Sequence, residues 1–122
     1  MDAFYKDIDN GNFSFVSSLP QKTFYELFIW ACGVRSSAIV SEFVTAGADL
    51  AYESNGPLFA ACEYGNMEVV KYLLGFARVR NNAHKMGNRA LIAAQLHNHT
   101  EIIELLSAIP AVANAYKLIE MF

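Results

Sequence analysis

The chain has 122 residues, a formal net charge of -3 and an apolar content of 54%. This length fits one domain, and so high an apolar content excludes an intrinsically disordered chain, which cannot offset its ordering entropy by burial. Apolar runs such as Phe28–Cys32 are far shorter than the roughly 20 residues that cross a bilayer, so no membrane association is expected. The acidic N-terminus lacks a signal-peptide pattern and there are only two Cys, which together predict a reduced, cytoplasmic protein.

Charge is distributed unevenly along the chain. Residues 1–68 carry nine acids and three bases, whereas residues 69–100 carry five bases and no acid. This asymmetry predicts an acidic surface beside a basic one.

A repeat with an offset of 33 residues organises the chain. The two best-matching segments are 56–74 and 89–107, in which Leu58 pairs with Leu91, Ala61 with Ala94, Glu68 with Glu101, Val69-Val70 with Ile102-Ile103 and Leu73 with Leu106. An upstream copy has Phe28, Ala31 and Cys32 in the places of Leu58, Ala61 and Cys62. A fainter copy opens the chain, where Phe15-Val16 and Leu19 follow Gly11-Asn12. Such self-similarity is typical of repeat proteins.

Each full copy is predicted to form two short helices. The first carries a large apolar residue three positions before a small pair, so both lie on one face, and the second carries apolar pairs one turn apart. Between them, Gly65 and Asn98 suit the left-handed conformation that ends a helix. Arg35 stands in the same place of the first copy, where that conformation would cost about 1 kcal/mol. Helix pairs this short cannot bury their apolar faces alone and must stack.

The predicted organisation is a single repeat domain over residues 1–122. It comprises a degenerate cap over 1–20, repeats over 21–50, 51–83 and 84–110, and a capping helix over 111–122. In the last segment Val112, Tyr116, Ile119 and Phe122 recur near helical spacing, as expected for a helix that covers the last repeat or forms a dimer contact.

Residues 56–74, GPLFAACEYGNMEVVKYLL, preceded by Ala46-Gly47-Ala48-Asp49-Leu50, resemble the ankyrin repeat. The family pattern is T-P-L-H-x-A, followed by A-x-x-G-H-x-E-I-V-K-x-L-L and G-A-D. The resemblance covers about residues 24–109 and implies an all-α solenoid of about three full repeats, which binds proteins and has no intrinsic catalysis. No copy keeps the Thr and His of T-P-L-H, so the hydrogen bonds that these residues make in the family are not expected here.

The resemblance also implies a binding surface, because ankyrin partners contact the fingers between repeats and the exposed edge of each first helix. The corresponding positions are Tyr52, Glu53, Asn55, Glu63 and Tyr64 in the middle copy and Lys85, Met86, Asn88, Leu96 and His97 in the next. Of these, Tyr52 and Tyr64 are the expected anchors, since aromatic residues carry much of the binding energy at interfaces.

A basic finger lies between the last two copies. Its bases are Arg78, Arg80, Lys85 and Arg89, whereas the preceding finger carries Asp49 and Glu53. One interpretation is a clamp for an acidic or phosphorylated segment of a partner, because Arg binds carboxylate and phosphate in a bidentate manner. The other is a solvated loop whose charges offset the acidic finger. No nucleic-acid partner is expected, because the patch is small and belongs to an acidic protein without a nucleic-acid-binding motif.

Other chemistry is not expected. Cys32 and Cys62 occupy the same place in adjacent copies, which predicts packing roles and no disulfide. His97 and His99 have no Cys or acid at ligand spacing, so no metal site is predicted. No phosphate-binding loop or catalytic set is recognisable, and neither a cofactor nor enzymatic activity is expected. Trp30 is expected to fill space beside the N-terminal cap.

Recognition of another protein is therefore the predicted function, and a monomer is the expected state. Two alternatives stay open. One is a targeting or substrate-docking domain of a larger enzyme or of a secreted bacterial effector, since drifted copies of this kind resemble ankyrin proteins of intracellular bacteria and large viruses that are delivered into host cells. The other is a scaffold that self-associates through the C-terminal helix.

Overall fold

A computed structural model describes residues 2–120, and the side chains of residues 3–86 and 88–115. Within residues 2–120 every regular element is a helix. The elements are α1 (Asp2–Asp9), the 3-10 turn η1 (Val16–Ser18), α2 (Gln21–Val34), α3 (Ser37–Thr45), α4 (Tyr52–Tyr64), α5 (Met67–Leu74), α6 (Ala77–Asn81), α7 (Lys85–Leu96), α8 (Thr100–Ser107) and α9 (Pro110–Glu120). The expected all-α class is confirmed.

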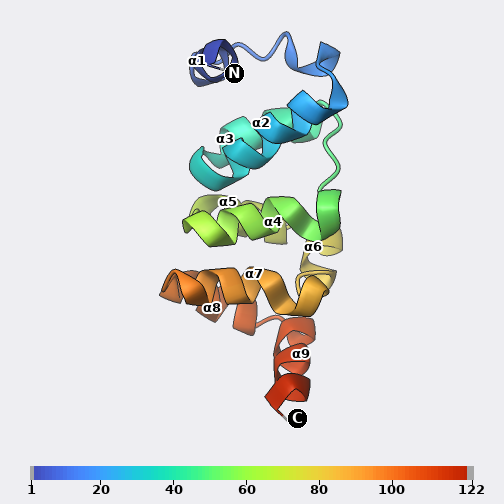
Figure 1. Cartoon of the computed structure of the whole chain (residues 1–122), viewed down its shortest axis with the longest axis vertical. Helices are drawn as coiled ribbons and strands as arrows, with labels where there is room; N and C mark the ends of the chain where they lie inside the picture. The colour runs from blue at the N-terminus through green and yellow to red at the C-terminus, as the bar shows by residue number, and fades with distance from the viewer. Residues whose placement is uncertain (1, 121–122) are drawn as a thin grey trace.

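The helices form a stack along the long axis of the molecule (Figure 1). The first helices α2, α4 and α7 lie one below another in front, and their partners α3, α5 and α8 lie behind them. The short helix α6 occupies the finger between the second and third pairs, and α9 descends along the stack axis beneath one end of α7. This is the solenoid that the repeat predicts.

The core follows the repeat register closely. Phe28 and Leu58 at the large apolar position are fully buried, and Leu91 is 4% exposed. The small residues three positions later, Ala31, Ala61 and Ala94, are fully buried too. Their small side chains let neighbouring first helices approach closely. The apolar pairs of the second helices close the core from behind, through Val40, Phe43, Val69, Val70, Leu73, Ile102 and Leu106.

The N-terminal segment is a partial helix pair. α1 buries Ile8 completely, while the expected second helix is reduced to the single turn η1, in which Val16 is buried. Trp30 of α2 packs on Tyr5 of α1 with ring centroids 4.4 Å apart. The prediction that Trp30 fills space beside the cap is therefore confirmed.

The turns between paired helices differ between copies. Gly65 has φ 73° and Asn98 has φ 57°, so both adopt the expected left-handed conformation. The expectation for Arg35 was wrong, because its backbone is extended with φ -129° and ψ 176°. Its guanidinium instead binds the carboxylate of Asp9 with an Nε–Oδ1 distance of 2.8 Å, which ties the first repeat to the cap and lowers the pKa of Asp9. The backbone of Arg35 therefore carries no left-handed strain.

Three consecutive non-glycine residues at the start of α4 adopt positive φ angles, a feature that the sequence did not predict. Glu53, Ser54 and Asn55 have φ 49°, 55° and 67°, and the regular helix begins after them. Met86 and Asn88 repeat the pattern at the start of α7 with φ 57° and 62°. Because non-glycine residues rarely take this conformation, contacts from the rest of the molecule must hold it.

No helix among the described residues is long and apolar enough to span a bilayer. The two Cys are free thiols, as the repeat register predicts. Cys32 and Cys62 are fully buried, and burial raises the pKa of each thiol to about 12.

Because the thiolate is the nucleophile, we expect neither thiol to react with Ellman's reagent at pH 8 in the folded protein. Both should react at once when the chain is unfolded in urea. Absorbance at the thionitrobenzoate band measures the reaction, and rapid labelling of a thiol under native conditions would contradict the packing described above.

Candidate functional site

The start of each first helix is tied to the segment that follows its repeat, which is a finger in the first two repeats and α9 in the third. The amide Nδ2 of Asn55 donates to the Val79 carbonyl oxygen at 3.4 Å, and Asn88 repeats this contact with Val112 at 3.2 Å. In the first repeat the backbone N–H of Asp49 donates to the Tyr25 hydroxyl at 2.8 Å. These contacts join the finger to the helix in repeats that lack the Thr and His of the ankyrin pattern.

The expectation that Asn55 and Asn88 lie on the partner surface therefore needs correction. Asn55 is 6% exposed and Asn88 is 1% exposed, and both side chains point to backbone carbonyls of the protein itself. Asn suits these positions because it tolerates positive φ better than other non-glycine residues. Asn55 holds the finger that contains α6, Asn88 holds the start of α9, and neither is available to a partner.

Arg89 is also engaged within the stack. Its Nη2 donates to the carbonyl oxygens of Glu53 and Ser54, and its guanidinium lies 4.7 Å from the centre of the Phe59 ring. A charged donor thus satisfies two carbonyls of the left-handed turn at the start of α4. Arg89 belongs to the third repeat and its side chain binds residues of the second repeat. It does not face outward as part of a clamp.

The other bases of the finger are not gathered into one clamp either. Arg78 pairs with Asp49 of the preceding finger, with 3.5 Å between Nη2 and Oδ1, and Arg80 donates to the Leu74 carbonyl oxygen at 3.1 Å. Arg78 and Lys85 border a hollow of about 330 Å³. Both members of the Arg78–Asp49 pair are exposed, so the pair adds little stability. The contacts favour the interpretation in which the basic finger offsets the acidic one.

Tyr52 and Glu53 border a second hollow, of about 450 Å³, at the first finger. The ring of Tyr52 is stacked on that of Tyr25, with centroids 3.9 Å apart and planes 8° from parallel. Desolvation and the adjacent carboxylate of Glu53 raise the pKa of the Tyr52 hydroxyl. Tyr52 is half-buried, and its ring has a structural role as well as an accessible edge.

Large apolar side chains are exposed along the edge where the first helices end. Val34 at the end of α2 is 44% exposed, and Tyr64 at the end of α4 is 64% exposed. The equivalent position after α7 is the polar residue His97, which is also exposed. Leu96 beside it is 74% exposed, and Met86 at the opposite end of α7 is 64% exposed. We call Val34, Tyr64 and His97 the edge row.

Two exposed apolar residues were missed by reasoning from the sequence. Val34 is equivalent to Tyr64, so the repeat register itself could have placed it in the edge row. Ile92 is 44% exposed and equivalent to Phe59, which is half-buried beneath Arg89. Its exposure could not be read from the register, because it depends on what stacks next to α7.

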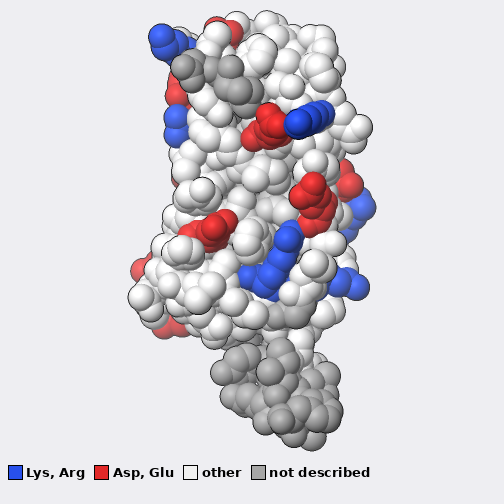
Figure 2. All heavy atoms as spheres, viewed as in Figure 1, with Lys and Arg blue, Asp and Glu red and all other residues white. Residues whose placement is uncertain are grey.

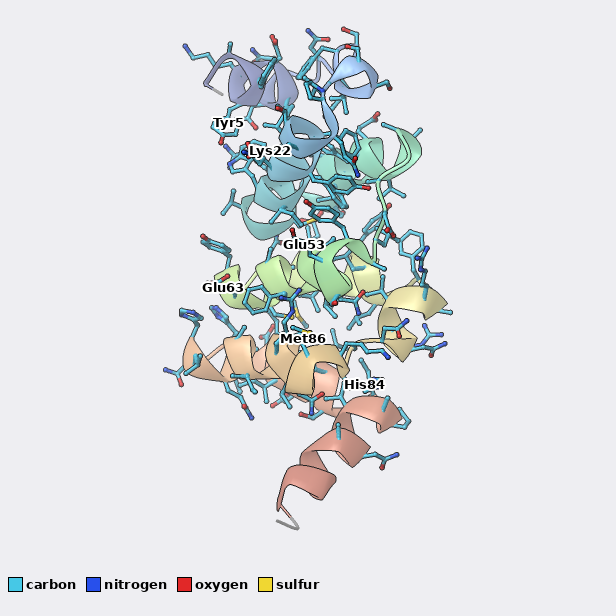
Figure 3. All side chains as sticks on the ribbon, turned by 45° about the vertical axis from the view of Figure 1, so that its right-hand side comes forward. Tyr5, Lys22, Glu53, Glu63, His84 and Met86 are labelled. Atoms are coloured by element: carbon cyan, nitrogen blue, oxygen red, sulfur yellow. The ribbon has the colours of Figure 1, made fainter. Side chains whose placement is uncertain are left out.

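The predicted site residues thus fall into separate groups. Glu53 and Met86 lie at the starts of α4 and α7, and Glu63 lies at the far end of α4 (Figure 3). The face shown in Figure 2 carries scattered acids and bases with wide uncharged areas between them, and no extended region of one sign. Such a surface is suited to shape and apolar contact more than to electrostatic capture.

The edge row rests on close contacts between repeats. A Cβ atom on Gly33 would lie 2.9 Å from the Tyr64 ring, so this ring packs directly on the backbone of the preceding repeat. In the next repeat, Nε2 of His99 lies 3.0 Å from the Glu63 carbonyl oxygen, which can only accept a hydrogen bond. Asn66, equivalent to His99, donates to the Cys32 and Arg35 carbonyl oxygens at 3.0 and 2.8 Å. These contacts make the edge a rigid support.

The described part of the chain contains no group of three or more His, Cys, Asp or Glu that could hold a metal. The rings of His97 and His99 stack with centroids 5.9 Å apart. The predicted dimer contact through Tyr116, Ile119 and Phe122 lies outside the described side chains.

Comparison with protein families matches residues 27–115 to the family described as ankyrin repeats, in three copies. No curated protein matches the chain. No solved structure matches it either. Ankyrin repeats are generally modules for protein–protein interaction and are typically non-catalytic. Because the match spans most of the sequence and agrees with the stacked helix pairs, this chain belongs to the ankyrin-repeat family.

Proposed function

We propose that this protein binds a partner protein through the edge row, with Tyr64 as its central anchor. The observation that carries the proposal is the exposure of Tyr64, which is 64% exposed at the middle of the row although its ring packs on Gly33. A Tyr ring fixed by its neighbours loses little conformational entropy on binding and offers both an apolar face and a hydroxyl.

Val34 and His97 extend the contact to the repeats on either side. Neighbouring polar groups, among them the half-buried Glu63, would form a rim around this centre. Tyr52 and Glu53 border a separate hollow and would contact a partner that reaches the first finger. Lys85 and Met86 offer a similar contact at the second finger.

The partner is proposed to be recognised chiefly by apolar contact. Arg78, Arg80 and Arg89 already bind an acid or carbonyl oxygens of this chain, and an acidic or phosphorylated segment would have to compete with those groups. Lys85 is the remaining base of the finger, and a single exposed Lys contributes modestly to binding. A role as the docking domain of a larger enzyme would use the same surface.

Replacement of Tyr64 or Val34 with Asp is expected to reduce partner capture at least tenfold, because a carboxylate would be desolvated at the centre of an apolar contact. Immobilised wild-type protein and variants are incubated with a lysate of the native cell, and retained proteins are quantified by mass spectrometry. Proteins retained by the wild type and lost from both variants are the candidate partners.

Thr45→Asp provides the matched control, since Thr45 is exposed at the end of α3, whereas the edge row lies where α2 ends and α3 begins. This variant should retain the same proteins as the wild type, and circular dichroism should show equal helical content for all four proteins. Retention of the same proteins by Tyr64→Asp and Val34→Asp at wild-type levels would refute the proposed surface.

A further inference from the structure

The edge row lies beside the turns that join paired helices, and these turns are acidic. With their flanking residues the turns span the segments 31–40, 61–70 and 94–103. Together the three segments contain three acids, which are Glu63, Glu68 and Glu101, and one base, Arg35. The edge row itself carries no Lys, Arg, Asp or Glu. The turns therefore supply the charges that lie nearest to it along the chain.

The bases near this edge do not neutralise the three acids. Nε and Nη2 of Arg35 donate to the two carboxylate oxygens of Asp9 at 2.8 and 3.1 Å, and Nη1 donates to the Val34 carbonyl oxygen at 2.9 Å. Lys71 follows Glu68 on α5 by one turn, but no ion pair joins them. Among the described side chains, no base lies within ion-pair distance of any of the three acids. The edge therefore has an excess of negative charge.

Glu68 is held in place beside the first part of the edge row. Its Oε1 accepts hydrogen bonds from the backbone N–H and the hydroxyl of Ser37 at 2.9 and 2.6 Å, and Ser37 begins α3 three residues after Val34. The Ser37 hydroxyl and amide hold the pKa of Glu68 below its usual range, so its carboxylate is ionised at neutral pH. Both donors bind the same oxygen, and Oε2 is left to accept from a partner.

The other two acids accompany the rest of the edge row. Glu63 directly precedes Tyr64 at the end of α4, where Figure 3 labels it. Glu101 borders a hollow of about 190 Å³ together with His99, whose ring stacks on that of His97 in the edge row. Figure 2 shows acids and no bases along the left-hand border of the second and third repeats, where α4 and α7 end. Acids thus line the edge in all three repeats.

This excess of negative charge selects a partner of one chemistry. An acidic or phosphorylated segment would be repelled by the three acids, and a second copy of the same edge would bring three further acids to the contact. A segment with Lys or Arg beside its apolar side chain gains attraction from each acid instead. The ends of these side chains would stay partly in water at the rim, so their desolvation cost is small.

We propose that the partner of the edge row is a protein segment in which an apolar side chain is flanked by Lys or Arg. The apolar side chain contacts Val34 and Tyr64. The flanking bases pair with the acids of the turns, which are Glu63, Glu68 and Glu101. Apolar contact supplies most of the affinity, and the acids select basic segments and speed their association. The inference rests on the proposed binding at the edge row and adds to it the charge of the partner.

Selection from a displayed library of random peptides, about 12 residues long, tests the charge preference. The full chain is immobilised, and peptides retained by the wild type but not by Tyr64→Ala are sequenced. These peptides should contain Lys and Arg at least about twice as often as the unselected library. Tyr64-dependent peptides without this excess would refute the inference and leave the edge row as a binding surface. The absence of any Tyr64-dependent peptide would count against the surface itself.

Fluorescence polarisation of the tightest selected peptide then measures the part of each acid. Glu63→Gln, Glu68→Gln and Glu101→Gln should each raise the Kd about two- to fivefold, the size expected of an ion pair at a rim, and the triple variant more than about tenfold. Gln at position 68 can still accept a hydrogen bond from Ser37, so the substitution removes the charge without removing that contact. Circular dichroism should show equal helical content for all variants.

Glu42→Gln is the matched control, because it removes the same charge from an exposed residue of α3 that lies three positions before Thr45. It should leave the Kd unchanged. A rise in NaCl from about 50 to about 500 mM should weaken peptide binding to the wild type more than to the triple variant, since salt screens ion pairs at a rim. Equal Kd values for the wild type and the triple variant, a loss in Glu42→Gln as large as in the edge variants, or equal salt dependence would each overturn the proposal. Partner capture by Val34→Asp and Tyr64→Asp is a separate readout, so the edge row can stand when the charge preference fails.

Discussion

Replacement of Phe28 with Ala is expected to lower the free energy of unfolding by about 3–5 kcal/mol, the usual range for a Phe removed from a fully buried site. Phe28 has no exposed surface, and its ring lies 5.7 Å from that of Phe43 and 6.2 Å from that of Tyr25. The rigid backbone of the helix pair can close only part of the resulting cavity. Urea unfolding followed by circular dichroism gives the value.

Phe59→Ala is the control for this prediction, because the same side chain is only half-buried beneath Arg89. Its loss should cost about 1–2 kcal/mol, from the apolar area and the cation–π contact that it removes. Equal destabilisation by the two variants would show that the core does not follow the large apolar position of the repeat.

Gly65→Ala is expected to cost about 2–4 kcal/mol, from two separate causes. Gly65 has φ 73°, where a side chain is strained, and a Cβ atom there would lie 2.5 Å from Cε1 of His99. Displacement of the ring would also break its hydrogen bond to the Glu63 carbonyl oxygen. The connection between the second and third repeats would therefore loosen. Urea unfolding measures the loss.

Two further variants separate these causes. Gly11→Ala introduces the same kind of backbone strain at φ 83°, but a Cβ atom there meets nothing within 4 Å, so it should cost only about 1 kcal/mol. In a double-mutant cycle, His99→Ala should relieve part of the Gly65→Ala penalty, because it removes the ring that the new methyl group meets. Strict additivity of the two substitutions would contradict the contact.

Much of the fold could be predicted because each repeat encodes it locally. Large and small apolar residues at fixed spacing placed Phe28, Ala31 and Leu58 in the core, and Gly65 and Asn98 marked the turns. The degenerate first turn misled the prediction, since Arg35 stands in the Gly position. Its extended backbone depends on an ion pair with Asp9 of the cap, a contact between segments that the local pattern does not contain.

The candidate site was less predictable, because the register places residues on a surface without showing what covers that surface. Tyr64, Met86, Leu96 and His97 are exposed as expected. Asn55, at an equally plausible position, turns inward to the Val79 carbonyl. A polar side chain in a turn can serve either a partner or the backbone, and only the neighbouring finger decides between them.

The basic finger shows that a count of charged residues in a segment does not predict a charged binding site. Counting residues placed four bases near one another, but Arg78, Arg80 and Arg89 bind three different parts of the stack. An Arg side chain is long, and the acceptors within its reach belong to other repeats. Net charge along the chain therefore did not translate into a positive site.

The amino-acid sequence by itself determined the family, the helix pairs and their register, because these depend on spacing within a repeat and on the need of each pair to stack. Only the tertiary structure decided which equivalent positions are covered. Ile29 and Phe59 are covered by the repeats that follow them, whereas Ile92 and Leu96 stay exposed because α9 turns along the stack axis. Whether an apolar residue of a first helix is buried depends on the helix that packs on it. At α7 that neighbour is α9, and no further first helix follows within the described residues.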